Sequence, residues 1–133
     1  MFNKWISRVN KKLNGRENMT ADKQIITNTL NWILNENSAA VFAIDEHYVQ
    51  VAVTMPGEIY CEAVSHHYHT AIDIGLESAF ISMGFHLEEG GNYSRRYSTA
   101  DTAVVEKLAD DIFKIFEELY RSDPAKPFEV TEL

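Results

Sequence analysis

The residues that could hold a metal lie close together in the sequence. His66, His67 and His69 follow Cys61 within eight positions, and imidazole and thiolate are common protein ligands of zinc and copper. The spacing matches no closed four-ligand site, and the sequence places neither a second cysteine nor a carboxylate to complete one. We therefore expect an exposed polar corner that binds metal only adventitiously, with no physiological metal and no cofactor.

Covalent catalysis is not indicated either. Cys61 alternates with Ile59 and Ala63 in an apolar run, a position typical of a buried, unreactive thiol. The sequence contains no GxSxG, GxxxxGK[ST], GxGxxG or HExxH motif, and no nucleophile, base and orienting group stand at an interpretable spacing. We expect a protein that is not an enzyme.

Adjacent pairs of charged residues are the last candidates for chemistry. The acidic pairs are Glu88-Glu89, Asp110-Asp111 and Glu117-Glu118. Neighbouring positions of a helix point about 100° apart, so such pairs do not converge on one substrate and are expected to be solvated. Arg95 and Arg96 interrupt this acidic sequence; one of them could anchor a partner's carboxylate, although an intramolecular ion pair is the more ordinary role.

Charge divides the chain into two parts. The net charge of the whole is −8, but residues 1–18 hold five basic side chains against Glu17. Residues 19–133 therefore hold seven basic against nineteen acidic side chains, a net charge of −12. Because an acidic body repels a phosphate backbone, we expect no nucleic-acid binding.

Residues 1–18 form a basic amphipathic segment. Its apolar side chains recur at helical spacing and are Phe2, Trp5, Ile6, Val9 and Leu13,. One interpretation is a short helix docked on the acidic body or on a second copy; the other is weak contact with an anionic membrane surface through Phe2, Trp5, Ile6 and Val9. Asn14-Gly15-Arg16 is expected to break this helix and act as a linker.

The cellular compartment is suggested by what the sequence lacks. One cysteine excludes an internal disulfide framework and fits a reducing compartment,. No run of about 18 apolar residues could span a bilayer, and basic side chains interrupt residues 1–13, where a secretory signal would need an apolar core. We expect a cytoplasmic protein.

Periodicity predicts a single α+β domain over residues 19–133. The expected elements are a helix 20–36 capped by Thr20, strands 39–44, 48–55 and 59–64, a helix 70–83 ended by Gly84, a hairpin 85–89 and 92–97, a helix 100–120 capped by Thr99, and a tail 128–133. The order α-β-β-β-α-β-β-α, after a short N-terminal amphipathic helix, predicts a twisted antiparallel sheet of a three-stranded meander plus a second hairpin. Helices are expected on one face only.

Four short motifs suggest a family. They are Tyr48-Val49-Gln50, Glu62-Ala63-Val64-Ser65-His66-His67-Tyr68, Met83-Gly84-Phe85 and Asn92-Tyr93-Ser94-Arg95. Over roughly residues 23–127 the chain resembles the YbjN and Tir-chaperone (TY-chaperone) group, which is similar to class I type III secretion chaperones. The resemblance implies a dimer that holds extended partner segments along its outside, with no catalytic residues. Some members of the group are described as sensory-transduction regulators.

Strand alternation predicts where a partner binds. If Val49 and its alternate neighbours face the helices, the other face carries Tyr48, Gln50, Tyr60 and Glu62, and tyrosine is enriched at binding surfaces. We expect these four residues, with Tyr93 and Arg95 of the second hairpin, to bind a protein partner.

Two further expectations concern assembly and the alternative function. The apolar stripe of helix 100–120 covers nearly half its circumference, which predicts burial against more than one surface and a homodimer. The favoured function is a noncatalytic, chaperone-like protein-binding domain, with a regulator as the alternative. A metal- or small-ligand-binding domain that uses His66, His67 and His69 is the less favoured alternative.

Overall fold

A computed structural model describes residues 15–65, 75–88 and 91–133, with side chains described from Lys23 onward. The elements are α2 (Gly15–Glu36), β1 (Ala39–Ile44), β2 (His47–Met55), β3 (Glu58–Ala63), α3 (Leu76–Ser82), β4 (His86–Leu87), β5 (Tyr93–Ser98), α4 (Val104–Lys114), the π-helical turn η1 (Ile115–Leu119) and β6 (Glu129–Glu132). The predicted N-terminal helix and the first turn of the predicted helix 70–83 lie outside the described residues.

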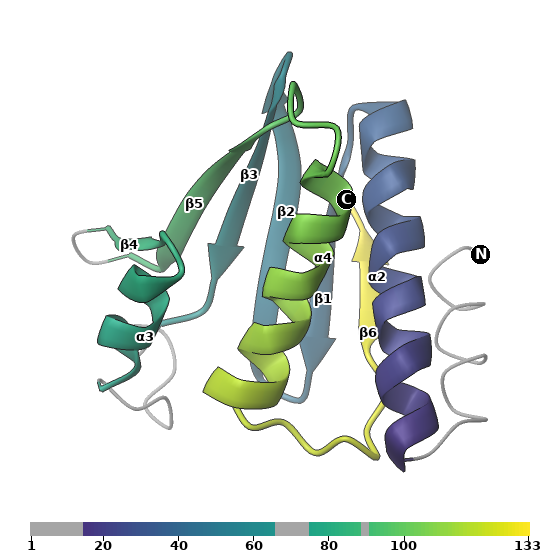
Figure 1. The fold of residues 1–133 in the computed structure, drawn as a ribbon, viewed down its shortest axis with the longest axis vertical. Coiled ribbons are helices and arrows are strands. Elements are labelled where there is room, and N and C mark those ends of the chain that lie inside the picture. The colour runs from purple at the N-terminus through teal and green to yellow at the C-terminus, as the bar shows by residue number, and fades with distance from the viewer. Residues whose placement is uncertain (1–14, 66–74, 89–90) are drawn as a thin grey trace.

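The six strands form one sheet in the order β4-β5-β3-β2-β1-β6 (Figure 1). Every neighbouring pair is antiparallel. The predicted meander is confirmed as β1, β2 and β3. Its two turns contain Asp45 with φ of 55° and Gly57 with φ of 84°, a left-handed conformation that aspartate and glycine adopt at low cost.

The helices cover one face of this sheet, as predicted. Figure 1 shows α2 and α4 in front of the strands, with α3 beside β4. The Lys23 ammonium of α2 lies 3.0 Å from the Asp110 carboxylate and 5.6 Å from the centre of the Phe113 ring, both on α4. The Phe80 ring of α3 stacks on Tyr93 of β5 at 4.1 Å. The molecule therefore has two layers, a sheet and a layer of helices.

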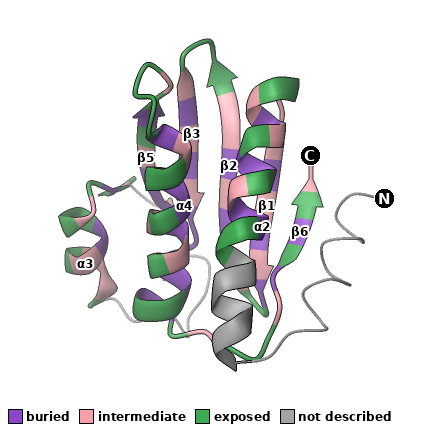
Figure 2. Cartoon of the chain, turned by 45° about the vertical axis from the view of Figure 1, so that its right-hand side comes forward, coloured by how far each residue is buried: buried purple, intermediate pink, exposed green. Residues whose placement is uncertain are grey.

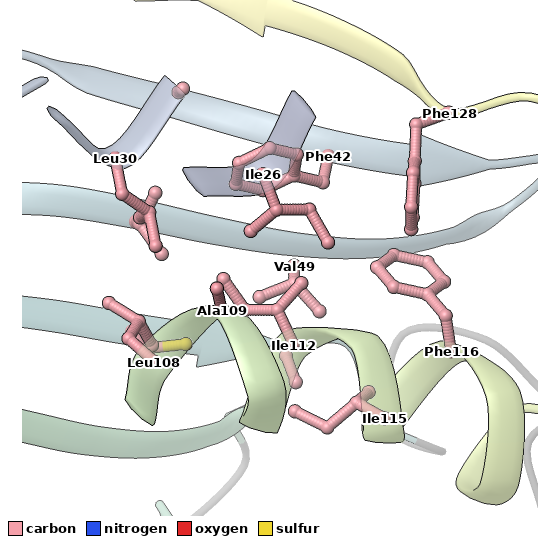
Figure 3. Close-up of a cluster of buried hydrophobic side chains, with 14 of the residues drawn as sticks. Ile26, Leu30, Phe42, Val49, Leu108, Ala109, Ile112, Ile115, Phe116 and Phe128 are labelled. Atoms are coloured by element: carbon pink, nitrogen blue, oxygen red, sulfur yellow. The ribbon is translucent and has the colours of Figure 1, made fainter. Parts of the chain in front are cut away.

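The core lies between these layers. Buried and partly buried residues alternate along β1 and β3 (Figure 2), as expected for strands with one covered face. Figure 3 shows how side chains from both layers meet: Ile26 and Leu30 come from α2, Phe42 and Val49 from the sheet, and Ile112 from α4. All five are fully buried, and burial of such side chains is the main force that stabilises the fold.

The wide apolar stripe of α4 and η1 is buried within one chain. Leu108, Ile112 and Ile115 are fully buried, Ala109 and Phe116 are nearly so, and α4 contacts both the sheet and α2. Wide apolar stripes are expected on a helix that packs against two neighbours. This packing accounts for the width that led us to expect a second copy.

The structure corrects both predicted N-terminal helix caps, Thr20 and Thr99. Helix α2 begins at Gly15, so Thr20 lies inside it, and Gly15 and Arg16 of the expected linker are helical; glycine costs about 1 kcal/mol in a helix interior but little at the first position. Thr99 donates its amide to the Gly57 carbonyl and does not cap α4. The carboxylate of Asp101 accepts a hydrogen bond from the Ala103 amide at 2.9 Å immediately before α4 begins.

The segment 128–133, expected to be a tail, supplies a sixth strand. Strand β6 pairs with β1 from Ala40 opposite Glu132 to Ala43 opposite Glu129. Phe128 and Val130 are buried beneath the helices, whereas Glu129 and Thr131 are exposed. This alternation was visible in the sequence, but four residues after a proline-containing loop are too few for periodicity alone to identify a strand.

Gly84 closes α3 in the conformation that its position predicted, with φ of 87°. A Cβ atom there would lie 3.1 Å from Arg95 Cζ. We expect Gly84→Ala to lower the free energy of unfolding by about 1–2 kcal/mol in urea titration, because alanine is strained at positive φ. Gly57→Ala is the matched control: its φ is 84°, but its nearest neighbour would be 3.9 Å away. Gly84→Ala should lower the free energy of unfolding more than Gly57→Ala does. An equal loss would show that the Arg95 side chain moves aside freely.

Candidate functional site

The face of the sheet away from the helices carries most of the predicted partner-binding residues, and we call it the open face. It is formed by Ala39, Val41, Ala43, Tyr48, Gln50, Ala52, Glu58, Tyr60, Glu62, Ser94, Arg96, Glu129 and Thr131. In the antiparallel register Val41 lies opposite Gln50, and Gln50 opposite Glu62. Paired residues share one face of a sheet. Among the described residues, no helix covers this face (Figures 1 and 2).

The centre of the open face is apolar and shallow. Ala39, Val41, Ala43 and Ala52 are small or branched residues of β1 and β2, each only partly buried. Small side chains allow another chain to approach the strands closely. The ring of Tyr48 lies opposite Ala43, so an aromatic side chain borders this apolar centre at one end.

Tyr48 is fixed by hydrogen bonds at the border of the open face. Its hydroxyl accepts a hydrogen bond from Asn92 Nδ2 at 3.0 Å. The Asn92 carboxamide oxygen in turn accepts one from the Ser65 amide at 2.9 Å, and Asn92 is buried. A buried amide left without its partner costs about 1–3 kcal/mol. Tyr48 therefore has a structural role beside any role in binding.

Tyr60 forms a charged and aromatic patch at the other end of the open face. The Arg96 guanidinium lies over the Tyr60 ring, 4.9 Å from its centre, and 2.9 Å from the Glu58 carboxylate. Tyr60 and Arg96 are directly opposite each other on β3 and β5. Cation–π contacts at exposed sites contribute about 0.5–1 kcal/mol, so little free energy holds the Arg96 side chain over the Tyr60 ring.

The structure separates Tyr93 and Arg95 from the other four predicted residues. Tyr93 is fully buried against Phe80, and Arg95 lies on the same, helix-covered face of β5. Their inclusion in the partner-binding surface is therefore corrected. The residues of β5 on the open face are Ser94 and Arg96, which the polar alternation Ser94, Arg96, Ser98 could have identified.

Arg95 forms an intramolecular ion pair, which was the more ordinary of its two expected roles. Its guanidinium lies 3.4 Å from Asp111 Oδ2 and donates a hydrogen bond to the Met83 carbonyl. It also lies 4.4 Å from the centre of the Tyr97 ring, and the Tyr97 hydroxyl donates to the same Asp111 oxygen at 2.8 Å. This network ties β5 to α4 and to the end of α3.

Burial makes the thiol and phenol groups near this network unreactive. Burial raises the pKa of Cys61 far above its ordinary value of 9.0, and the Asp111 carboxylate adds to the shift. Burial also raises the pKa of Tyr97 well above 10.0, with Cys61 and Asp111 contributing. A neutral, buried thiol is a poor nucleophile and a poor metal ligand. Cys61 is thus buried and free, as its alternation predicted.

The other groups considered for chemistry remain dispersed. Asp110 pairs with Lys23, whereas the adjacent Asp111 pairs with Arg95, so the acidic pair diverges around α4. The described residues include no group of three histidine, cysteine or acidic side chains arranged to hold a metal ion. His66, His67 and His69 lie outside the described residues.

Comparison with protein-family models, with curated proteins and with solved structures finds no match to this chain. Within the described residues, no helix combines the length and the apolar character needed to cross a bilayer.

Proposed function

We propose that this protein is a noncatalytic, chaperone-like binding protein that holds an extended segment of another protein on its open face. The single observation that supports the proposal most is a continuous sheet face with an apolar centre and no helix over it among the described residues. Sheets whose two faces are equally covered leave no such surface, whereas antiparallel sheets with one free face present side chains and edges to partners.

Charge favours a basic, partly apolar partner segment. Glu58, Glu62 and Glu129 project from the open face, and Glu58 is paired with Arg96. Residues 19–133 together carry a net charge of −12. Complementary charge speeds association and disfavours wrong partners. An extended segment with apolar residues at its centre would place apolar side chains on Val41 and Ala52, and basic residues at its ends could reach Glu62 and Glu129 at the borders of the face.

The resemblance to the secretion-chaperone group supports the same function. It implies partner segments held in extended form along the outside of the domain, which requires an uncovered surface. A sensory-transduction regulator is the alternative that the same resemblance implies. The homodimer also stays a prediction: light scattering at micromolar concentration that returns only a 15.2 kDa species would contradict it.

The proposal is tested by titrating the full chain with a short synthetic peptide that has valines at its centre and lysines at both ends, while NMR records backbone amide shifts. We expect shifts concentrated on β1, β2 and β3. The variant Tyr60→Ala, Glu62→Lys should weaken binding at least about tenfold, because an aromatic anchor and a favourable charge are lost. Tyr48 is left intact since its hydroxyl supports Asn92.

A matched variant, Ile81→Ala with Glu106→Lys, makes the same kinds of change at exposed positions of α3 and α4. It should bind the peptide as the unaltered chain does. The proposal would be overturned if both variants bound equally well, or if a valine–glutamate peptide bound as tightly as the lysine peptide. Shifts confined to α3 and α4 would also overturn it.

A further inference from the structure

A pocket of about 300 Å³ opens at the end of α4, on the side of the molecule that carries the helices. Its walls are mainly apolar and aromatic, and its mouth is charged. The lining residues are Ile44, Phe113, Phe116, Glu117, Arg121, Ser122, Asp123, Pro124, Lys126 and Phe128. This volume is at the lower limit for ligand sites and suits one or two large apolar side chains.

The shape of the pocket depends on an unusual helix end. The π-helical turn η1 extends α4, with the Tyr120 amide donating to the Ile115 carbonyl at 2.8 Å. Arg121 then takes a positive φ of 53°, and the Ser122 amide donates to the Phe116 carbonyl at 2.8 Å. Such π turns occur frequently at functional sites. Here the wider turn and the reversal after it form one wall of the pocket.

The charges at the mouth favour a basic occupant. The Lys126 ammonium lies 2.8 Å from the Asp45 carboxylate, which balances its charge. The other charged lining residues are two acids, Glu117 and Asp123, and one base, Arg121. The helix end nearby adds the partial negative charge of its carbonyl groups. An apolar side chain carried on a basic segment therefore matches both the walls and the mouth.

The start of α2 lies at the same end of the molecule as this pocket. Lys23 contacts Asp110 and the ring of Phe113, which lines the pocket. Gly15 precedes Lys23 by eight residues, about 12 Å along a helix,. Figure 1 shows that α2 begins at the end where α4 finishes and where the chain continues to β6. Gly15, to which residues 1–14 are joined, thus lies at the same end of the molecule as the pocket.

From these observations we propose that the pocket binds an apolar side chain of the chain's own residues 1–14, which lie outside the described residues. The segment combines four basic residues, Lys4, Arg8, Lys11 and Lys12, with apolar residues at helical spacing, among them the large side chain of Trp5. Fourteen residues can reach up to about 46 Å when extended. Attachment also raises the effective concentration of the segment to about the millimolar range, so a weak contact suffices.

This inference does not depend on the proposed function, because the pocket and the open face lie on opposite sides of the sheet and use different residues. It assigns the basic amphipathic segment a partner within the same chain in place of a membrane surface.

The test places two cysteines in the full chain, Ser7→Cys, which leaves Trp5 in place, and Ala125→Cys. It measures disulfide formation under mild oxidation by nonreducing electrophoresis and mass spectrometry. Ala125 is exposed and lies between Pro124 and Lys126, which line the pocket, so the substitution should leave the fold and the charges of the mouth unchanged. Cys61 is buried and stays unreactive. The control pairs Ser7→Cys with Thr54→Cys, an exposed residue at the far end of β2.

We expect an intramolecular disulfide with Ala125→Cys to form at least about tenfold faster than with Thr54→Cys, because a docked segment holds the two sulfur atoms within bonding reach. Raising the salt concentration should slow the Ala125→Cys pair more than the control pair, since salt screens the attraction between the basic segment and the acidic mouth. Equal rates for the two pairs would overturn the proposal. A disulfide between two chains would also overturn it, since it would place the segment on a second copy.

Discussion

Replacing Phe80 by alanine is expected to lower the free energy of unfolding by about 3–5 kcal/mol, the usual range for removing a buried aromatic side chain. Phe80 is fully buried. Its ring stacks on Tyr93 at 4.1 Å and meets Phe85 edge-on at 5.6 Å. It is the only fully buried residue of α3, and Leu76 and Ala79 of the same helix are partly buried against the core, so Phe80 is the main attachment of α3 to the sheet. Urea titration followed by circular dichroism measures the loss.

The neighbouring residue provides the control. Ile81 belongs to the same helix and is 55% exposed, so Ile81→Ala should change the free energy of unfolding by no more than about 0.5 kcal/mol. If Phe80→Ala also cost less than about 1 kcal/mol, α3 would contribute little to the cooperative fold, and the aromatic cluster would not be the attachment that we describe.

Stability is expected to fall steeply in alkali. Burial raises the pKa of Cys61, Tyr97 and Tyr120 in the folded protein above the ordinary values of 9.0 for the thiol and 10.0 for the phenols. The unfolded chain therefore releases these protons at lower pH than the folded protein does. The contribution of these groups to the free energy of unfolding is fully present below about pH 9. Above that pH the free energy of unfolding declines by about 1.4 kcal/mol per pH unit for each group that is ionised only when unfolded.

Urea titrations between about pH 7 and about pH 11 measure this dependence. Tyr97→Phe removes one of the three groups, so the slope above about pH 10 should become shallower by about 1.4 kcal/mol per pH unit. The variant also loses the hydrogen bond to Asp111, which lowers stability at every pH and leaves the slope as the informative quantity. An unchanged slope in the Tyr97→Phe variant would show that the ionisation of Tyr97 does not contribute to the loss of stability in alkali.

The sequence was sufficient to predict the fold class and the meander because those features depend on strong local patterns. Alternation in residues 39–64 and the turn at Pro56-Gly57 determine the strands and their order. The same alternation correctly assigns Tyr60 and Glu62 to the face opposite Ile59 and Cys61. Such periodicity reports burial directly.

Features that depend on tertiary contacts were harder to predict. Tyr93 and Arg95 have polar ends, and residues of these types are commonly exposed, but the Phe80 ring buries one and Asp111 pairs with the other. The pocket next to η1 arises where α4 meets the loop before β6, between residues as far apart in the sequence as Ile44 and Phe128. No local pattern signals that meeting, because π turns have no simple periodicity.

Strand β6 also covers the edge of β1, which would otherwise be the outer edge of the sheet. Strand β1 has the sequence AAVFAI, with no charge, no proline and no glycine, and such six-residue segments aggregate readily when their edge is free. In the folded protein β6 occupies that edge: it is short, carries Glu129 and Glu132, and is fastened by the Leu133 amide, which donates to the Ala39 carbonyl at 2.9 Å. The outermost strand is thus an acidic cover over an uncharged strand of the chain. Detachment of β6 would expose the edge of β1 to pairing with another chain and would also remove Val130 from the core.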